Sequence, residues 1–267
     1  MKSFKKFAIL PHFLITFGLF FLISCAGESD KSKIETVRPL PIGHIEFIKT
    51  MYPAIHSENQ QILNKREQIN KLRKRYRPVI KGGKNLEWLS EVATRYKFDA
   101  DFFHEDLSRT EYRQRIDSLL VHVDIVPDKL VMAQAAIESG WGQSRFAKEG
   151  NSFFGLRCFR PGCGMPATDV ENPTFWVKSY PNVEACVKEY IWNLNVGHAY
   201  DDLRLIRYQL RNEGKIPDAH DLATALERYS EIGNDYIKLI ISVINKWLPE
   251  DLEAFVLHHS KEIASSE

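Results

Sequence analysis

Glu138 is the residue of this sequence best suited to general-acid chemistry. It lies near the end of an Ala-rich apolar stretch, Asp128–Ser139, which predicts a helix that Gly140 terminates. On a 3.6-residue repeat Glu138 falls beneath Val131 and Ala135, so its carboxyl group should project from the apolar face. Burial and the negative end of the helix both raise a carboxyl pKa, and a protonated acid can protonate a leaving glycosidic oxygen. The alternative is a frayed helix end with Glu138 pointing into water.

Aromatic and amide side chains follow Glu138 closely. Trp141, Phe153 and Phe154 offer ring faces that could stack on pyranose rings, and the amide of Asn151 could bridge sugar hydroxyl or acetamide groups. Ordinary core packing explains aromatic residues equally well. Their concentration in a stretch rich in glycine favours a site, because glycine permits the sharp turns that sites on loops need.

Three ordered motifs give this stretch a family resemblance. Residues 133–142 read AQAAIESGWG, residues 151–156 read NSFFGL, and residues 228–236 read RYSEIGNDY. Their order and spacing resemble the glucosaminidases of glycoside hydrolase family 73. The third motif is similar to that of the Bax-like members of the family. The resemblance covers roughly residues 127–247.

The resemblance implies a lysozyme-like fold and an endo-β-N-acetylglucosaminidase that cleaves the β-1,4 bond following N-acetylglucosamine in peptidoglycan. Glu138 matches the catalytic acid of the family, and Tyr229 matches a tyrosine that assists near the reacting sugar. Structural support is the alternative role for the residues that match groove positions. These substrate-binding candidates are Trp141, Asn151, Phe154 and Tyr236.

The second catalytic group is open. A glycosidase needs a base or a nucleophile opposite its acid, unless the acetamide of the substrate serves instead. Asp169 and Glu171 lie in the expected hairpin, where the family often places its second acid, and we favour Glu171. Glu231 is a further candidate that could equally be a surface ion-pair residue.

Two other classes of function compete with this hypothesis. A lytic transglycosylase would cut at the other sugar with a lone Glu and leave an anhydro product. A non-catalytic wall-binding lipoprotein would keep the groove without the chemistry. A peptidase is disfavoured because no Cys/His or Ser/His arrangement has a recognisable context. No cofactor or metal is expected.

The N-terminus carries the pattern of an export signal. Lys2, Lys5 and Lys6 precede an apolar run, and Leu22–Cys25 resembles a bacterial lipobox. We therefore expect residues 1–24 to be a lipoprotein signal peptide and Cys25 to carry a lipid anchor in the membrane. Ala26 after the cysteine favours the periplasmic face of the outer membrane as the location in the cell envelope. An uncleaved membrane helix is the alternative.

Charge and cysteine content narrow the partners further. With 36 basic and 35 acidic side chains, the formal net charge is +1, so no global field attracts nucleic acid. In an oxidising compartment Cys158 and Cys163 could form a disulfide that closes a short loop. Zinc is the competing interpretation, but no histidine lies at ligand spacing. Cys186 reads as a small buried hydrophobe.

The apolar periodicity predicts an α+β fold that is predominantly α. After a tether over residues 25–43 we expect an N-terminal helical region over 44–122, with a break near Pro53. The lysozyme-like domain spans 123–249 and contains a small β-hairpin lobe that turns through Gly164. Helical patterns follow over residues 183–196, 201–211, 221–229 and 234–247, and Pro249 comes just after the last of them. Residues 250–267 read as a C-terminal tail.

Overall fold

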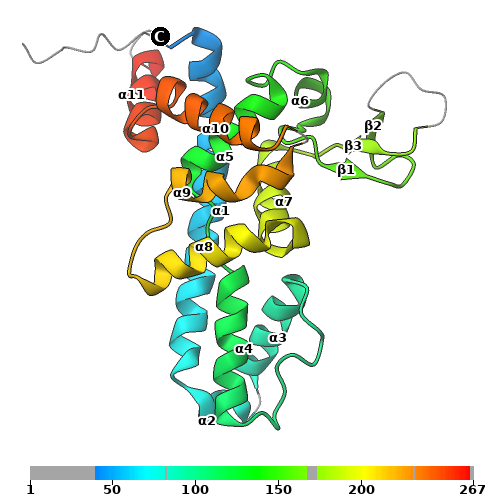
Figure 1. Cartoon of the computed structure of the whole chain (residues 1–267), viewed down its shortest axis with the longest axis vertical. Helices are drawn as coiled ribbons and strands as arrows, with labels where there is room; N and C mark the ends of the chain where they lie inside the picture. Colours follow the sequence, from blue (N-terminus) through cyan, green and yellow to red (C-terminus); the bar gives the residue numbers. More distant parts are fainter. Residues whose placement is uncertain (1–39, 82, 167–172, 231, 265–267) are drawn as a thin grey trace, which may run out of the picture. The chain divides into compact units, whose positions relative to one another are not determined.

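Helices make up most of the computed structural model, which describes residues 40–81, 83–166, 173–230 and 232–264 (Figure 1). This confirms the predominantly α, α+β fold. The α-helices are α1 (Ile42–Arg73), α2 (Tyr76–Ile80), α3 (Lys84–Arg95), α4 (Arg109–His122), α5 (Asp128–Ser139), α6 (Arg145–Gly150), α7 (Val183–Val196), α8 (Asp201–Asn212), α9 (Ala219–Ala223), α10 (Asn234–Trp247) and α11 (Leu252–Ala264). Two 3₁₀ helices are η1 (His198–Tyr200) and η2 (Thr224–Tyr229).

The β lobe is a three-stranded antiparallel sheet of β1 (Arg157–Cys158), β2 (Gly164–Pro166) and β3 (Trp176–Lys178), in the order β1-β3-β2. The predicted turn occupies residues 160–163, but Gly164 itself opens an additional strand and pairs with Lys178. A side chain at Gly164 would collide with the Val177 carbonyl oxygen, so this glycine permits close approach of the strands. A disulfide joins Cys158 to Cys163 across the connection between β1 and β2.

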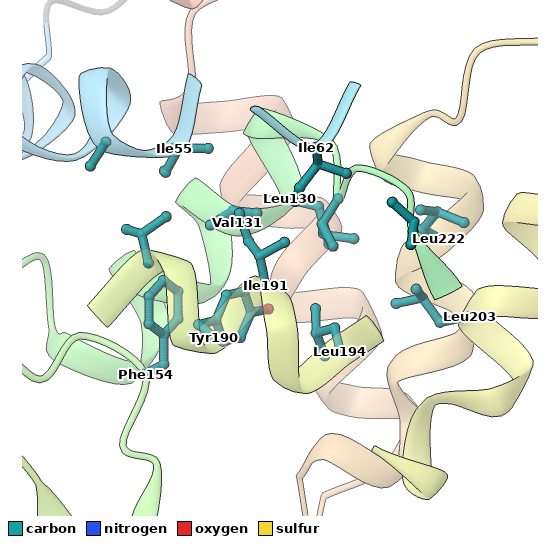
Figure 2. Close-up of a cluster of buried hydrophobic side chains, with 14 of the residues drawn as sticks. Ile55, Ile62, Leu130, Val131, Phe154, Tyr190, Ile191, Leu194, Leu203 and Leu222 are labelled. Atoms are coloured by element: carbon teal, nitrogen blue, oxygen red, sulfur yellow. The ribbon is translucent and has the colours of Figure 1, made fainter. Parts of the chain in front are cut away.

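Helix α1 supplies one wall of the core. It packs against both α5 and α7, and Figure 2 shows Ile55 and Ile62 of α1 facing apolar side chains of these helices. The expected break near Pro53 is absent, since Pro53 lies inside a continuous helix. Residues 40–267 cluster as one compact unit, so the helical region 44–122 and the domain 123–249 share a core.

Several helix ends lie where the local sequence places them. Ser108 caps α4 through a capping box with Glu111, and Gly140 ends α5 in the left-handed conformation. The expected C-terminal tail is instead largely the helix α11. Its apolar residues Leu252, Phe255 and Val256 recur at helical spacing and pack on the core. The helix predicted over residues 221–229 divides into α9 and η2.

The predicted signal peptide, the lipidation site Cys25 and most of the tether lie outside the described residues. Helix α1 begins at Ile42, just before the expected end of the tether. Among the helices that the structure describes, none is long and apolar enough to cross a membrane.

Candidate active site

The C-terminus of α5 presents Glu138 beside a tight reversal of the chain. Residues 140–142 take successive positive φ values of 58°, 57° and 75°. The Ser139 hydroxyl donates to the Ala135 carbonyl oxygen at 2.6 Å and accepts from the Gly142 amide at 2.8 Å. These bonds satisfy backbone groups that the helix end would leave unpaired, so Glu138 stands at a rigid corner.

Glu138 combines access with partial enclosure. Its side chain is reachable by solvent, yet protein surrounds enough of the carboxyl group that desolvation raises its pKa. The Tyr236 hydroxyl donates a hydrogen bond to Oε1 of Glu138 at 2.8 Å, which opposes the rise without cancelling it. The raised pKa agrees with the expectation from the apolar helix face. Such a group can hold a proton at a higher pH than an ordinary glutamate.

A chain of hydrogen bonds orients the Tyr236 hydroxyl. Tyr190 on α7 donates to Oε1 of Gln134, and Nε2 of Gln134 donates to the oxygen of Tyr236 at 3.1 Å. Gln134 is 0% exposed and lies one turn before Glu138 on α5. The Tyr236 oxygen accepts a hydrogen bond from the Gln134 amide. The hydroxyl proton of Tyr236 therefore points to Glu138 and donates to it. Gln134 and Tyr190 are therefore positioning residues.

Stacked aromatic rings hold the two tyrosines of the third motif in place. Tyr229 stacks on Tyr236 with ring centroids 5.4 Å apart and an interplanar angle of 9°. The Tyr229 hydroxyl donates to the Phe154 carbonyl oxygen at 3.2 Å, rather than to Glu138. Phe154 is 3% exposed and stacks on Tyr190 at 3.7 Å. The structure thus places Tyr229 next to the residue that contacts the acid.

Trp141 and Asn151 also make contacts within the protein. Trp141 stacks on His44 of α1 at 3.6 Å and 7°, with Phe47 at its edge. Asn151 adopts φ 48° at the end of α6 and donates from Nδ2 to the Tyr180 carbonyl oxygen at 3.1 Å. These contacts hold both side chains against neighbouring elements, and their binding of substrate stays a prediction.

Glu138 is the acid that the hydrogen bond from Tyr236 identifies among the described residues. Glu171, Asp169 and Glu231 all lie outside them. Burial and Tyr236 account for the pKa of Glu138, to which no described carboxylate contributes. Within the same residues, no group of three or more His, Cys, Asp or Glu side chains could hold a metal ion.

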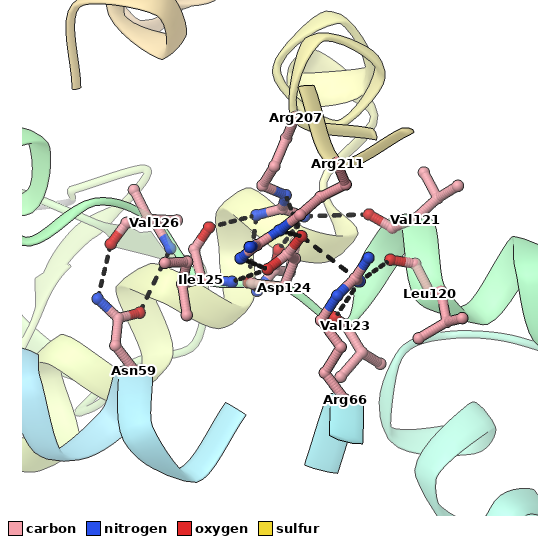
Figure 3. Close-up of polar contacts among 11 residues, drawn as sticks. Asn59, Arg66, Leu120, Val121, Val123, Asp124, Ile125, Val126, Arg207 and Arg211 are labelled. Atoms are coloured by element: carbon pink, nitrogen blue, oxygen red, sulfur yellow. Dashed lines mark hydrogen bonds and ion pairs between the residues drawn. The ribbon is translucent and has the colours of Figure 1, made fainter. Parts of the chain in front are cut away.

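The start of α5 is anchored by α1. Asn59 donates from Nδ2 to the Val126 carbonyl oxygen at 2.7 Å and to Oδ1 of Asp128 at 2.6 Å, while its Oδ1 accepts from the Val126 amide. Figure 3 shows Asn59 reaching this segment. Side chains from outside the catalytic motif thereby fix the axis of the helix that carries Glu138.

A buried charge cluster lies beside this anchor, in the connection between α4 and α5 (Figure 3). Asp124 is 1% exposed and accepts two hydrogen bonds from Arg211, at 2.9 and 3.0 Å. Arg66 lies 3.4 Å and Arg207 4.0 Å from the same carboxylate. Arg207 also donates to the carbonyl oxygens of Val121 and residues 124–125. One carboxylate and three guanidinium groups thus link α1 and α8 to the entry of α5.

Sequence reasoning missed Gln134, Tyr190 and this charge cluster. Gln134 is the one polar side chain between Lys129 and Glu138, and that isolation in an apolar helix was a usable signal. Nothing in the local sequence distinguishes Asp124 or Arg207 from surface residues, because their partners are distant along the chain.

A protonatable glutamate at the end of a buried helix, held by a tyrosine of another helix, fits a glycosidase-type enzyme. Comparison with known proteins agrees. Residues 113–248 match the glucosaminidase family, described as mannosyl-glycoprotein endo-beta-N-acetylglucosaminidase, and the chain belongs to this family. The chain is 30% identical over 213 residues to the protein named Protein bax of Escherichia coli (strain K12), covering 79% of this chain and 73% of that one. These matches confirm the family resemblance. No solved structure matches the chain.

Tyr236→Phe should raise the pKa of Glu138 further. The lost hydrogen bond stabilises the ionised carboxylate, so its removal favours the protonated form. We expect the alkaline limb of the pH–kcat profile to move up by roughly half to one pH unit. Tyr229→Phe is the matched control, since that hydroxyl donates to a backbone carbonyl and its loss should leave the limb in place. An unmoved limb in Tyr236→Phe would contradict the assignment.

Proposed function

We propose that the protein is an exported peptidoglycan hydrolase, an endo-β-N-acetylglucosaminidase that cleaves β-1,4 bonds after N-acetylglucosamine. The observation that carries the proposal is Glu138 itself, an accessible acid with a raised pKa and a hydrogen bond from Tyr236. Membership of the glucosaminidase family supports the glycan as the substrate class.

In this mechanism protonated Glu138 gives its proton to the leaving glycosidic oxygen as the bond to the anomeric carbon breaks. Tyr236 keeps its hydrogen bond to the carboxylate that results, and so stabilises the ionised product state. A second group must then stabilise the positive sugar or activate water. Glu171 is our first candidate, with Asp169, Glu231 and the substrate acetamide as alternatives.

The proposed location is the cell envelope, with a lipid anchor on Cys25 at the periplasmic face of the outer membrane. The support is the basic, apolar and lipobox-like order of the N-terminal sequence. Labelling cells with a palmitate analogue tests the anchor. Label should enter the wild type and be lost in Cys25→Ala, and equal labelling of both would contradict the assignment.

A lytic transglycosylase is the second candidate function. It would use Glu138 without a second carboxylate, because that reaction closes the sugar on itself and needs no activated water. Both enzymes would release soluble glycan, so this alternative differs from ours in its product.

Dye-labelled peptidoglycan tests whether the protein cleaves glycan at all. The purified full chain should release soluble dye from washed sacculi, in proportion to time and enzyme. Sedimentation of the protein with the sacculi without dye release would identify the non-catalytic wall-binding alternative and contradict our proposal.

A further inference from the structure

A pocket lies on the face of α7 opposite the active site. It has a volume of about 390 Å³ and is lined by Arg95 of α3 and by Ala185, Lys188, Glu189 and Trp192 of α7. The four α7 residues follow the i, i+3, i+4, i+7 spacing of one helix face, whereas Tyr190 faces Gln134 from the other side. Arg95 lies before the segment that matches the glucosaminidase family.

The pocket has a surplus of positive charge. Within the described chain, neither Arg95 nor Lys188 has a carboxylate at ion-pair distance, and Glu189 is occupied by Lys178 at 2.5 Å. The nearby carboxylate of Glu58 is 9% exposed, and burial raises its pKa although Lys65, Lys188 and Arg95 oppose the rise.

Trp192 gives the pocket a fixed aromatic wall. Its indole Nε1 donates to the Arg95 carbonyl oxygen at 2.8 Å, which ties α7 to the end of α3. The ammonium group of Lys97 lies 5.3 Å from the ring centroid. A half-buried ring held in this way provides an apolar surface for a sugar at little cost in side-chain entropy.

We propose that this pocket is a second binding site for an N-acetylmuramyl peptide, with the sugar ring against Trp192 and a carboxylate of the peptide at Arg95 and Lys188. The inference rests on the proposed function, because peptidoglycan supplies N-acetylmuramyl peptides, which combine a sugar ring with carboxylates. The site would hold a strand or a released fragment away from Glu138. Neutral N-acetylglucosamine oligomers lack the anionic group and should not depend on the two cations.

Calorimetric titration of N-acetylmuramyl dipeptide into the full chain tests the site. The probe contains one sugar and no glycosidic bond between sugars, so binding is measured independently of catalysis. We expect saturable binding that weakens with added salt and falls about tenfold or more in the double variant Arg95→Ala/Lys188→Ala. Arg113→Ala, an exposed cation outside the pocket, is the matched control and should bind as the wild type does.

Equal binding of the muramyl dipeptide by the wild type and the double variant would overturn the proposal. It would also be overturned if the neutral oligomer triacetylchitotriose bound with the same dependence on Arg95 and Lys188. Glu138→Gln should bind the muramyl dipeptide normally. If the wild type failed to cleave sacculi while pocket-dependent binding persisted, the proposed function alone would fail. Reduced sedimentation of the double variant with sacculi would identify the intact strand as the ligand, and unchanged sedimentation would identify the released fragment.

Discussion

Glu138→Gln should lower kcat on peptidoglycan by about 10²- to 10⁴-fold, the usual contribution of a general acid. Gln keeps the size of the side chain and can still accept from Tyr236, but it has no proton of suitable acidity to give. Substrate binding should change little, because the lost interaction is made as the bond breaks. Initial rates of fragment release across substrate concentrations separate kcat from KM.

The fold of this variant should be intact. Glu138 is partly desolvated in the native state, so replacing it with a neutral isostere should leave the thermal midpoint unchanged or slightly higher. Glu149→Gln makes the same chemical change at an exposed position of α6 and is the matched control. Wild-type rates in Glu138→Gln would remove Glu138 from the mechanism.

Asp124→Asn should destabilise the protein by about 3–5 kcal/mol, the range observed when one partner of a buried ion pair is removed. The change leaves Arg66, Arg207 and Arg211 around a neutral group that cannot compensate their charge. Urea unfolding at neutral pH measures the loss. Asp117→Asn is the matched control, because Asp117 pairs with Arg73 at a partly exposed position and should cost less than about 1 kcal/mol.

The difference in stability between the wild type and Asp124→Asn should depend on pH. Burial alone would raise the pKa of Asp124, but the hydrogen bond from Arg211 and the charges of Arg207, Arg66 and Arg211 outweigh it and lower the pKa. A lowered folded-state pKa contributes stability above the unfolded-state pKa, and that contribution is lost as pH falls through the folded-state value. The stability gap between wild type and Asp124→Asn should therefore narrow below about pH 4. A constant gap down to pH 2 would contradict this account.

Local patterns predicted most of the helices. The apolar residues of α7 and α10 recur at helical spacing, and a glycine follows α5. These signals predicted the three helices because they lie within the local sequence of each element. Helix α11 was missed because Pro249 resembled a terminal stop. The sheet was predicted as a hairpin because the order β1-β3-β2 depends on pairing across a long connection, which local sequence does not specify.

The residues of the candidate site that lie in local motifs were predicted, whereas contacts between distant segments were not. Glu138 and Tyr236 came from motifs, and the structure joins them with a hydrogen bond across 98 positions of sequence. The stacking of Trp141 on His44 could not be predicted, because His44 belongs to a helix that carries none of the motifs. The cluster around Asp124 unites residues from α1, α8 and a loop, each unremarkable in its own segment.

The products of a peptidoglycan digest test the central claim most directly. Mass spectrometry of fragments released from purified sacculi, with and without borohydride reduction, identifies the sugar at each new end. Our account predicts reducible ends of N-acetylglucosamine that appear with wild-type protein and are absent with Glu138→Gln. Non-reducible anhydromuramic ends would contradict it and assign the protein to the lytic transglycosylases.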